Sequence, residues 1–474
     1  MTTAVVVGSG PNGLAAAVRL AHAGIDVTVL EAHDRPGGGA RSSELTLPGL
    51  LHDECAAFHP TGFASPYFTS LDLQRHGLNW LWPEVDLAHP LDDGRVGLAA
   101  RDLGHTDASL GEDAARWRRL FAAPVRNFED LIEDVFQPVV HVPSHPITLG
   151  RFGMKALQPA TWIARHFRDD PARALYMGVA AHAFSTLTTP LSGSVGMMIT
   201  ASAHAVGWPV AEGGTGAITR ALLAELAEHG GKVITGTRVT SLHSLSDLTG
   251  STPDVVMLDT APAGVLEIVG DRLPSRVRRA LTRYSYGPAA FKVDLAIDGD
   301  IPWRNPDCLK AGTLHLGGDA EQIVGIEAAT VRGEMPDQPF VLLGQQYLVD
   351  PSRSAGNANP IYAYAHVPHG YDGDATEAVI NQIERFAPGF RERILAIATH
   401  NPAGLEAANA NYVGGDISAG ANTARQIAFR PRPAANPYTL GVSGVYLCSS
   451  ATPPGAGVHG MGGFNAAETA LRKL

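Results

Sequence analysis

The sequence predicts an α/β protein in which a Rossmann-like dinucleotide-binding domain is interleaved with an α+β domain that carries an antiparallel sheet and a helical cap. Three observations indicate this fold. The N-terminus has a strand, a glycine-rich turn, a helix and a second strand in direct succession. Alternating strand patterns recur in residues 286–435, as they do in antiparallel sheets. A glycine-rich stretch at 453–463 precedes a short helical pattern.

The N-terminal unit has the spacing of a dinucleotide-binding fingerprint. Ala4–Val7 is a continuous apolar run, typical of a buried parallel strand, and it leads into Gly8, Gly10 and Gly13. In this frame the first glycine makes the tight turn, the second lets backbone approach a pyrophosphate, and the third lets the helix pack on the strand. A second strand, Val27–Leu30, follows the helix. We therefore expect the phosphates of a dinucleotide at the helix N-terminus.

Charged residues after the second strand extend this predicted site. Glu31 ends the strand, where a carboxylate can accept hydrogen bonds from the hydroxyl pair of a ribose. An acid at this position disfavours a 2′-phosphate, which argues against NADP. The triplet Gly37–Gly39 and then Arg41 follow. We interpret them either as a second phosphate clamp or as a solvated loop with a surface charge.

The stretch "PPGAGVHGMGG", Pro453–Gly463, contains five glycines in eleven residues. A disordered tail would be charged or of low complexity, and a hairpin needs only one or two glycines. We interpret the stretch as backbone left bare so that a large, flat group can lie against it. His459 is its only titratable side chain. This histidine is either a general base or donor, or a residue that packs and hydrogen-bonds to backbone.

Composition argues against several classes of protein. With 36 basic and 47 acidic residues the net charge is −11, and no basic block occurs, so we expect no nucleic-acid partner. Cys55, Cys308 and Cys448 form no C-x-x-C pair, which argues against a redox disulfide and a zinc knuckle. The three cysteines fit a reducing compartment. The N-terminus has no basic and apolar leader pattern, so we expect a cytoplasmic protein.

Two domains built from five segments fit the patterns better than three consecutive domains. The nucleotide-binding domain is predicted to comprise residues 1–70, 206–285 and 436–474, and the second domain residues 71–205 and 286–435.

Local patterns predict the elements of these segments. The middle of the chain is expected to be helical, as the periodicity of 114–139 indicates. Lys232–Leu242 is expected to pair as strands, and residues 254–260 to form another buried strand. The alternation of 291–297 and 361–367 predicts antiparallel strands.

With these motifs the chain resembles the flavoprotein superfamily of phytoene desaturases, amine oxidases and protoporphyrinogen oxidase. The resemblance begins with the glycine fingerprint, Glu31 and "RPGGGARS", and continues through 207–242, 284–303, 383–395 and 444–471. It covers nearly the whole chain. The most similar group is that of the phytoene-desaturase-related oxidoreductases, which includes pyridine nucleotide-disulfide oxidoreductase domain-containing protein 2.

The resemblance implies an amine-oxidase-type fold that binds FAD non-covalently. It implies that Val239 meets adenine through its backbone and that the helix start at Gly462 and Gly463 points at flavin N1 and O2. The implied cofactor-binding residues are Gly8, Gly10, Pro11, Asn12, Gly13, Glu31, Ala32, Gly38, Gly39, Ala40, Arg41, Val239, Gly457, Gly460, Met461, Gly462 and Gly463.

The implied function is an FAD-dependent oxidoreductase of the dehydrogenase or desaturase kind. It would oxidise a C–C or C–N bond of a lipophilic small molecule by hydride transfer to flavin N5. Because the chain has only one dinucleotide fingerprint, we expect oxygen or a quinone, rather than a nicotinamide, as the partner in electron transfer. Two alternatives remain open. One is a flavin-dependent isomerase or hydratase without net redox, and the other is a flavin-free binding protein of the Rab GDP-dissociation inhibitor type.

Histidines are the candidates for direct chemistry. His459 is expected near the flavin, and the resemblance implies that His204 and His59 lie towards the substrate face, although each could also be a satisfied core histidine. Lys292 is interpreted as a strand residue with a tethered charge rather than a catalytic group. No metal site is expected, because Pro143 interrupts the helical spacing of the nearby histidines.

The sequence leaves open what binds to the surface of the protein. Residues 149–168 mix aromatic and aliphatic residues with Arg and Lys, so they are either a membrane-facing substrate entrance or a solvated pair of cap helices. A homo-oligomer is also left open.

Overall fold

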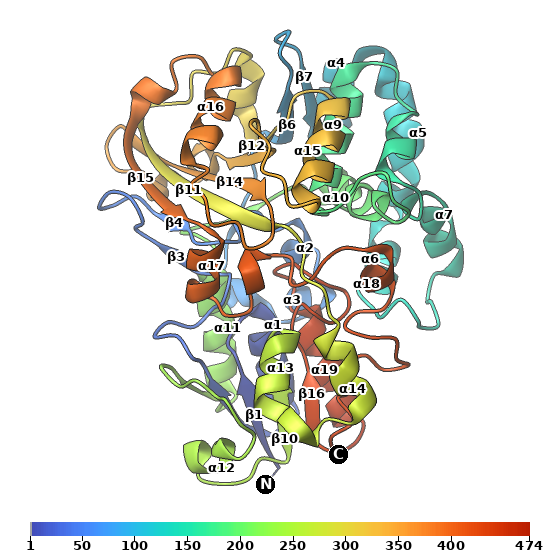
Figure 1. Ribbon diagram of the computed structural model, residues 1–474, viewed down its shortest axis with the longest axis vertical. Helices are drawn as coiled ribbons and strands as arrows, with labels where there is room; N and C mark the ends of the chain where they lie inside the picture. Colours follow the sequence, from blue (N-terminus) through green and yellow to red (C-terminus); the bar gives the residue numbers. More distant parts are fainter. Residues whose placement is uncertain (1) are drawn as a thin grey trace.

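The computed structural model describes residues 2–474, and it consists of two lobes stacked along the long axis with both termini at one end (Figure 1). The lobe at the termini is built on a five-stranded parallel sheet with the order β16-β10-β1-β2-β9. Its strands are β1 (Thr3–Val7), β2 (Asp26–Leu30), β9 (Lys232–Ile234), β10 (Val255–Leu258) and β16 (Val445–Leu447). This Rossmann-like sheet confirms the predicted fold class.

Helices cover both faces of this sheet. Because successive residues of a strand point to opposite faces, Ala4 and Val6 join one apolar core, whereas Val5 and Val7 join another. The helices of the first core are α1 (Pro11–His22), α11 (Gly216–Glu228) and α19 (Met461–Leu471), and those of the second side are α12 (Ser244–Thr249), α13 (Pro262–Val269) and α14 (Ser275–Thr282). The continuous apolar run of β1 is thus explained by burial on both sides.

The second lobe contains a seven-stranded sheet with the order β15-β11-β14-β13-β12-β6-β7. All its neighbours are antiparallel except β6 and β12. The strands are β6 (Val85–Pro90), β7 (Val96–Ala99), β11 (Ala289–Asp298), β12 (Ala311–Leu316), β13 (Val341–Gly344), β14 (Ala358–Val367) and β15 (Ile394–His400). The predicted antiparallel sheet is confirmed. One face packs on α16 (Thr376–Phe386), and the other carries Tyr362 and Tyr364 towards the first lobe.

Two element predictions were wrong. The middle segment is not wholly helical, since β6 and β7 come from it and complete the second sheet. Lys232–Leu242 pairs as a strand only as far as Ile234. Gly236 then adopts φ +65°, a left-handed conformation that cannot continue a strand.

A helical cap flanks the second sheet (Figure 1). Its helices are α4 (Leu103–Leu110), α5 (Ala114–Arg126), α6 (Phe128–Val135), α7 (Pro146–Ala156), α8 (Ala160–Ala164), α9 (Asp170–Ala181), α10 (Gly193–Ala205) and α15 (Ala320–Val331). Trp117, Phe121 and Tyr176 fill the core between them. Short elements complete the fold: β3 (Ser42–Ser43), β4 (His52–Asp53), α2 (Pro60–Phe63), α3 (Pro66–Ser70), β5 (Trp80–Leu81), β8 (Val210–Ala211), α17 (Pro402–Ala408) and α18 (Ala424–Ala428).

Across residues 2–474, none of the helices combines the length and the apolar character that crossing a bilayer requires.

Candidate functional site

A cavity of 1020 Å³ joins the two lobes. Its outer end lies at the carboxyl edge of the parallel sheet, where Val7, Leu30 and Asp259 line it. Ligands of open α/β sheets bind at this edge. Its inner end is lined by aromatic residues of the second lobe, including Phe184 and Tyr364. One continuous space therefore connects the predicted nucleotide site with the second sheet.

The glycines of the N-terminal turn are required by close packing. Gly8 adopts φ +100°. A Cβ atom at Gly10 would lie 2.6 Å from Oδ2 of Asp259, and one at Gly13 would lie 2.2 Å from the carbonyl oxygen of Gly8. Both distances are far below van der Waals contact. The turn therefore brings bare backbone and the start of α1 to the cavity, which fits the pyrophosphate of a dinucleotide.

Asp259, which was not among the predicted site residues, lies against this turn. Its Oδ2 accepts a hydrogen bond of 3.0 Å from the backbone N–H of Gly13. Burial raises the pKa of the Asp259 carboxyl to about 7, and the charge of Glu31 adds to this rise. A signal was present in the sequence, because an acid that ends a buried parallel strand lies at the ligand-binding edge of the sheet.

Glu31 and Arg41 line the cavity as the sequence predicted, and each is held by protein contacts. The Glu31 carboxylate accepts hydrogen bonds from the backbone N–H groups of Ser9 at 2.9 Å and His33 at 2.8 Å. Nε of Arg41 lies 3.0 Å from Oε2 of Glu54, and its NH2 group donates to the Ala408 carbonyl. These contacts orient both charges before any ligand binds.

The structure brings most of the predicted cofactor residues to the cavity. Those that line it are Gly8, Gly10, Pro11, Asn12, Glu31, Ala32, Gly38, Gly39, Arg41, Val239 and Gly457. Those packed outside its lining are Gly13, Ala40, Gly460, Met461, Gly462 and Gly463.

The C-terminal glycines divide into two groups with different roles. Residues 453–459 line the cavity, in agreement with the interpretation of bare backbone. Gly460–Gly463 instead lets α19 pack on its neighbours, because a Cβ at Gly463 would lie 1.8 Å from the carbonyl oxygen of Asn12. Gly462 and Gly463 do not themselves line the cavity, and the expectation that this helix start points at flavin N1 and O2 stays a prediction.

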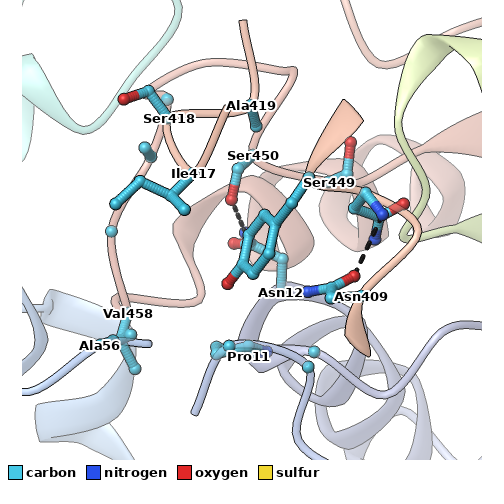
Figure 2. Close-up of a pocket in the computed structure, with 18 of the residues that line it drawn as sticks. Pro11, Asn12, Ala56, Asn409, Ile417, Ser418, Ala419, Ser449, Ser450 and Val458 are labelled. Carbon is cyan, nitrogen blue, oxygen red and sulfur yellow. Dashed lines mark hydrogen bonds between the residues drawn. The ribbon is translucent and has the colours of Figure 1, made fainter. Parts of the chain in front are cut away.

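Polar side chains from three segments that are distant in sequence line the same cavity as the C-terminal glycines. Figure 2 shows Asn12 at the start of α1 hydrogen-bonded to Ser450, which follows β16, with Nδ2 and Oγ 3.1 Å apart. Asn409 lies nearby and accepts a hydrogen bond from the backbone N–H of Asn411 (Figure 2). Asn12 was among the predicted cofactor-binding residues, whereas the sequence carried no signal for Ser450 or Asn409, since only the fold brings them near Asn12.

His459 lines the cavity, and its contacts are with backbone and an aromatic ring. Its Nδ1 accepts a hydrogen bond from the Met461 N–H at 3.1 Å, and its ring centroid lies 5.0 Å from that of Phe136. Burial lowers the pKa of His459 to about 4. Of the two interpretations of His459, a general base or a packed residue, these contacts fit the packed and neutral histidine.

His204 and His59 lie outside the cavity lining. His204 is buried in the cap, where its Nε2 accepts from the Trp117 indole at 2.8 Å and its Nδ1 donates to the Ala100 carbonyl at 2.7 Å. His59 is buried against Thr215, with Nε2 and Oγ1 2.8 Å apart. The structure thus does not bring the three candidate histidines together.

Lys292 is also outside the cavity lining. It is buried on β11, where it forms an ion pair with Asp294, and its Nζ lies 4.5 Å from the ring centroid of Tyr362. This geometry matches the interpretation of a tethered charge.

Two side-chain clusters in residues 2–474 have the spacing of metal ligands, and both contain Glu225. One adds His22 and His229, and the other adds His76 and Glu228. The Glu225 carboxylate already pairs with Arg75 at 2.5 Å. These clusters lie away from the cavity and do not contribute to its chemistry.

The inner end of the cavity is mostly apolar and was not predicted residue by residue. It is lined by Phe58, Phe152, Phe184, Met198, Ile199, Trp208, Leu342, Tyr362 and Tyr364. His182, at the end of α9, is the histidine of this part.

The comparisons with known proteins agree with this arrangement. Residues 6–71 match the family model described as an NAD(P)-binding Rossmann-like domain. The chain is 24% identical to mouse pyridine nucleotide-disulfide oxidoreductase domain-containing protein 2, over 99% of this chain and 93% of that protein. It is 23% identical to the lycopene-forming phytoene desaturase of Pseudescherichia vulneris, over 97% of each.

A solved structure of putrescine oxidase bound to putrescine has a similar fold. It matches with a TM-score of 0.62 and 16% identity, over 100% of this chain and 98% of that chain. The resemblance predicted from the motifs is thereby confirmed. Over nearly its whole length the chain is thus similar in sequence to pyridine nucleotide-disulfide oxidoreductase domain-containing protein 2 and to phytoene desaturases.

Proposed function

We propose that this protein is an FAD-dependent oxidoreductase that removes a hydride from a C–C or C–N unit of a lipophilic small molecule. The observation that supports this most is the single cavity, which has a dinucleotide-binding turn at one end and an aromatic chamber at the other. FAD has an ADP half and a flavin half, so it needs a cavity that extends from the dinucleotide-binding turn towards the second lobe.

The residues of the outer end fit the ADP half of FAD. The bare backbone of Gly10 and the start of α1 would face the pyrophosphate, and Glu31 would hold the ribose hydroxyls. Gly455 and Gly457, at φ +116° and +139°, form part of the wall next to Pro453 and Pro454. FAD, when bound, supplies the two-electron acceptor.

The inner chamber would hold the substrate. Its aromatic and aliphatic walls exclude water and favour an apolar molecule. Because residues 2–474 contain one dinucleotide-binding turn of this kind, we propose oxygen or a quinone as the electron acceptor.

The test is FAD uptake followed by anaerobic reduction. Purified protein incubated with FAD and desalted should show a flavin absorption spectrum, and Glu31→Gln should weaken FAD binding about tenfold by loss of charged hydrogen bonds. Glu392→Gln, at an exposed acid outside the cavity lining, is the matched control. A panel of lipids, polyenes, amines and alcohols should contain a compound that bleaches the flavin.

Three outcomes would contradict the proposal. Protein that takes up no FAD would favour a flavin-free binding protein. Turnover that needs reduced flavin but consumes no acceptor would favour an isomerase or hydratase. Rapid stoichiometric reduction of the flavin by NADH would contradict the proposed acceptors.

We propose that a lipophilic substrate enters from an anionic bilayer through a surface formed by residues 136–168. This segment contains four Lys or Arg residues and no acid, in a chain of net charge −11. It also holds seven large apolar side chains that are more than half exposed: Val139, Val140, Val142, Ile147, Met154, Leu157 and Trp162. Val139 and Phe152 line the cavity, so the surface adjoins the chamber.

Vesicle flotation tests this surface. Wild-type protein should float with vesicles of phosphatidylcholine and phosphatidylglycerol at low salt, and added salt should weaken the interaction. Ile147→Ser combined with Trp162→Ser should abolish flotation, whereas Leu395→Ser, a control at a similarly exposed position on β15, should not. Failure of the wild type to float at low salt rejects the bilayer as its partner.

A further inference from the structure

His315, Leu342 and Tyr364 form a row across the inner face of the second sheet. The strand register pairs His315 of β12 with Leu342 of β13, and Leu342 with Tyr364 of β14. Because paired residues of neighbouring strands share a face, all three side chains lie on one side. His182, at the end of α9, meets this row from above, with its Nε2 2.8 Å from Nε2 of His315.

The hydrogen bond between His182 and His315 joins two neutral rings. Burial lowers the pKa of His182 to about 3 and holds the pKa of His315 well below its usual value. A neutral imidazole carries one proton, so one Nε2 donates and the other accepts. The direction of this bond decides which nitrogen of His182 can meet a ligand.

The surroundings of His315 set that direction. Its Nδ1 is buried and has no hydrogen-bond partner within residues 2–474. It faces the backbone of Gly178, where a Cβ would lie 3.0 Å from it. A buried N–H without an acceptor is rarer in proteins than an unpartnered acceptor. His315 therefore carries its proton on Nε2 and donates it to His182, so His182 carries its own proton on Nδ1.

His182 therefore has an N–H to offer at an otherwise apolar wall. Its Nε2 is occupied by His315, and it lines the cavity beside Trp208, whose ring meets it edge to face at 5.4 Å. The indole N–H of Trp208 also has no partner in the described chain. Phe184 and Leu342 provide apolar surface around these donors.

We propose that His182, oriented by His315, donates a hydrogen bond to a carbonyl or hydroxyl oxygen of a substrate that is otherwise apolar. His182 contacts the ligand, and His315 is a positioning residue. An alkylammonium group has no lone pair to accept this bond, so the subsite disfavours protonated amines. The inference rests on the proposed function, because the ligand is taken to be the substrate of that reaction. The subsite itself is defined by the residues that line the cavity.

Isothermal titration with a shape-matched pair of probes tests the subsite. In 2-octanone the carbonyl oxygen occupies the place of the methylene group in 2-methyl-1-octene. Because the carbonyl group costs more to desolvate than the methylene group, the test compares the ketone-to-alkene affinity ratio between wild-type protein and variants. His182→Phe should lower this ratio about tenfold, the change expected from one lost hydrogen bond, while the alkene still binds.

His315 variants distinguish orientation from packing. His315→Leu should lower the preference for the ketone, and His315→Gln, whose amide can still donate to His182, should restore most of it. Thermal melting of each variant confirms folding. An unchanged ratio in His182→Phe overturns the inference, as does a wild-type protein that binds neither probe.

FAD uptake, measured on the same samples, separates the two proposals. Wild-type protein that binds FAD but has the same ketone-to-alkene ratio as His182→Phe overturns the subsite alone. Protein whose ratio falls in His182→Phe but that takes up no FAD keeps the subsite and overturns the proposed function.

Discussion

The two ends of the cavity are built in different ways. At the nucleotide end, Gly8, Gly10 and Glu31 lie within one short segment of the chain, and backbone atoms of the glycines form part of the cavity surface. At the inner end, His182 and Tyr364 come from α9 and β14, which are far apart in the chain, and side chains form the surface. The nucleotide end is therefore suited to a ligand group that does not change, such as a pyrophosphate. At the inner end, changes of side chain can adapt the cavity to a different substrate.

The largest expected effect is at Gly13, where the nucleotide end depends on a close backbone approach. Gly13→Ala would place a methyl group 2.2 Å from the carbonyl oxygen of Gly8, which cannot move without opening the turn. We expect a loss of about 3 kcal/mol in the free energy of unfolding and loss of FAD binding. Urea denaturation and flavin absorbance of the desalted protein measure the two effects.

Gly325→Ala is the matched control for this substitution. Gly325 lies within α15, and a Cβ there meets nothing within 4 Å. Alanine should raise the stability by about 0.5–1 kcal/mol, because glycine in a helix costs conformational entropy. If Gly13→Ala behaved like this control, the nucleotide end would not rest on close packing.

The difference between a nucleotide end that is local in sequence and an inner end built from distant segments explains which residues the sequence could predict. The strand, glycine turn and Glu31 are local in sequence, so their spacing alone predicted their place. His315 and His182 are single histidines in apolar surroundings, and only the strand register and the position of α9 make them neighbours. Asp259 was predictable in principle from the edge of the sheet, whereas the packing role of Gly463 depends on how α19 meets α1.

The second prediction concerns Asp259 at the nucleotide end. The folded protein keeps the Asp259 proton up to about pH 7, whereas an unfolded chain releases it at about pH 4. The folded state thus binds more protons in this window, so the free energy of unfolding falls as pH rises from 4 to 7. Asp259→Asn should flatten this slope, and Asp372→Asn, an exposed acid, should not.

FAD affinity should follow the same ionisation. A charged Asp259 carboxylate beside the turn repels the pyrophosphate, whereas its protonated form does not. We expect FAD to bind more tightly at pH 6 than at pH 8, and Asp259→Asn to remove most of this difference. Quenching of flavin fluorescence at each pH measures the dissociation constants. Equal pH dependence in both proteins would place the carboxylate away from the phosphates.

His459, in the wall of the cavity, gives the third prediction. His459→Ala leaves the buried Met461 N–H without its acceptor, at a cost of about 1–3 kcal/mol. His459→Asn should recover part of this stability. Because the pKa of His459 is about 4, the rate of flavin reduction should not titrate with this residue between pH 5 and 9. A pH-dependent step lost in His459→Ala would identify the histidine as a base.

The smallest expected effect is at Val239, where the nucleotide end is expected to use backbone. Val239 belongs to a buried core cluster and also lines the cavity, so Val239→Ala should cost about 1 kcal/mol in stability through lost burial. FAD affinity per folded molecule should change less than about threefold, since a backbone contact survives the substitution. A larger loss would show that the Val239 side chain itself binds the ligand. The nucleotide end would then share with the inner end a dependence on side-chain shape.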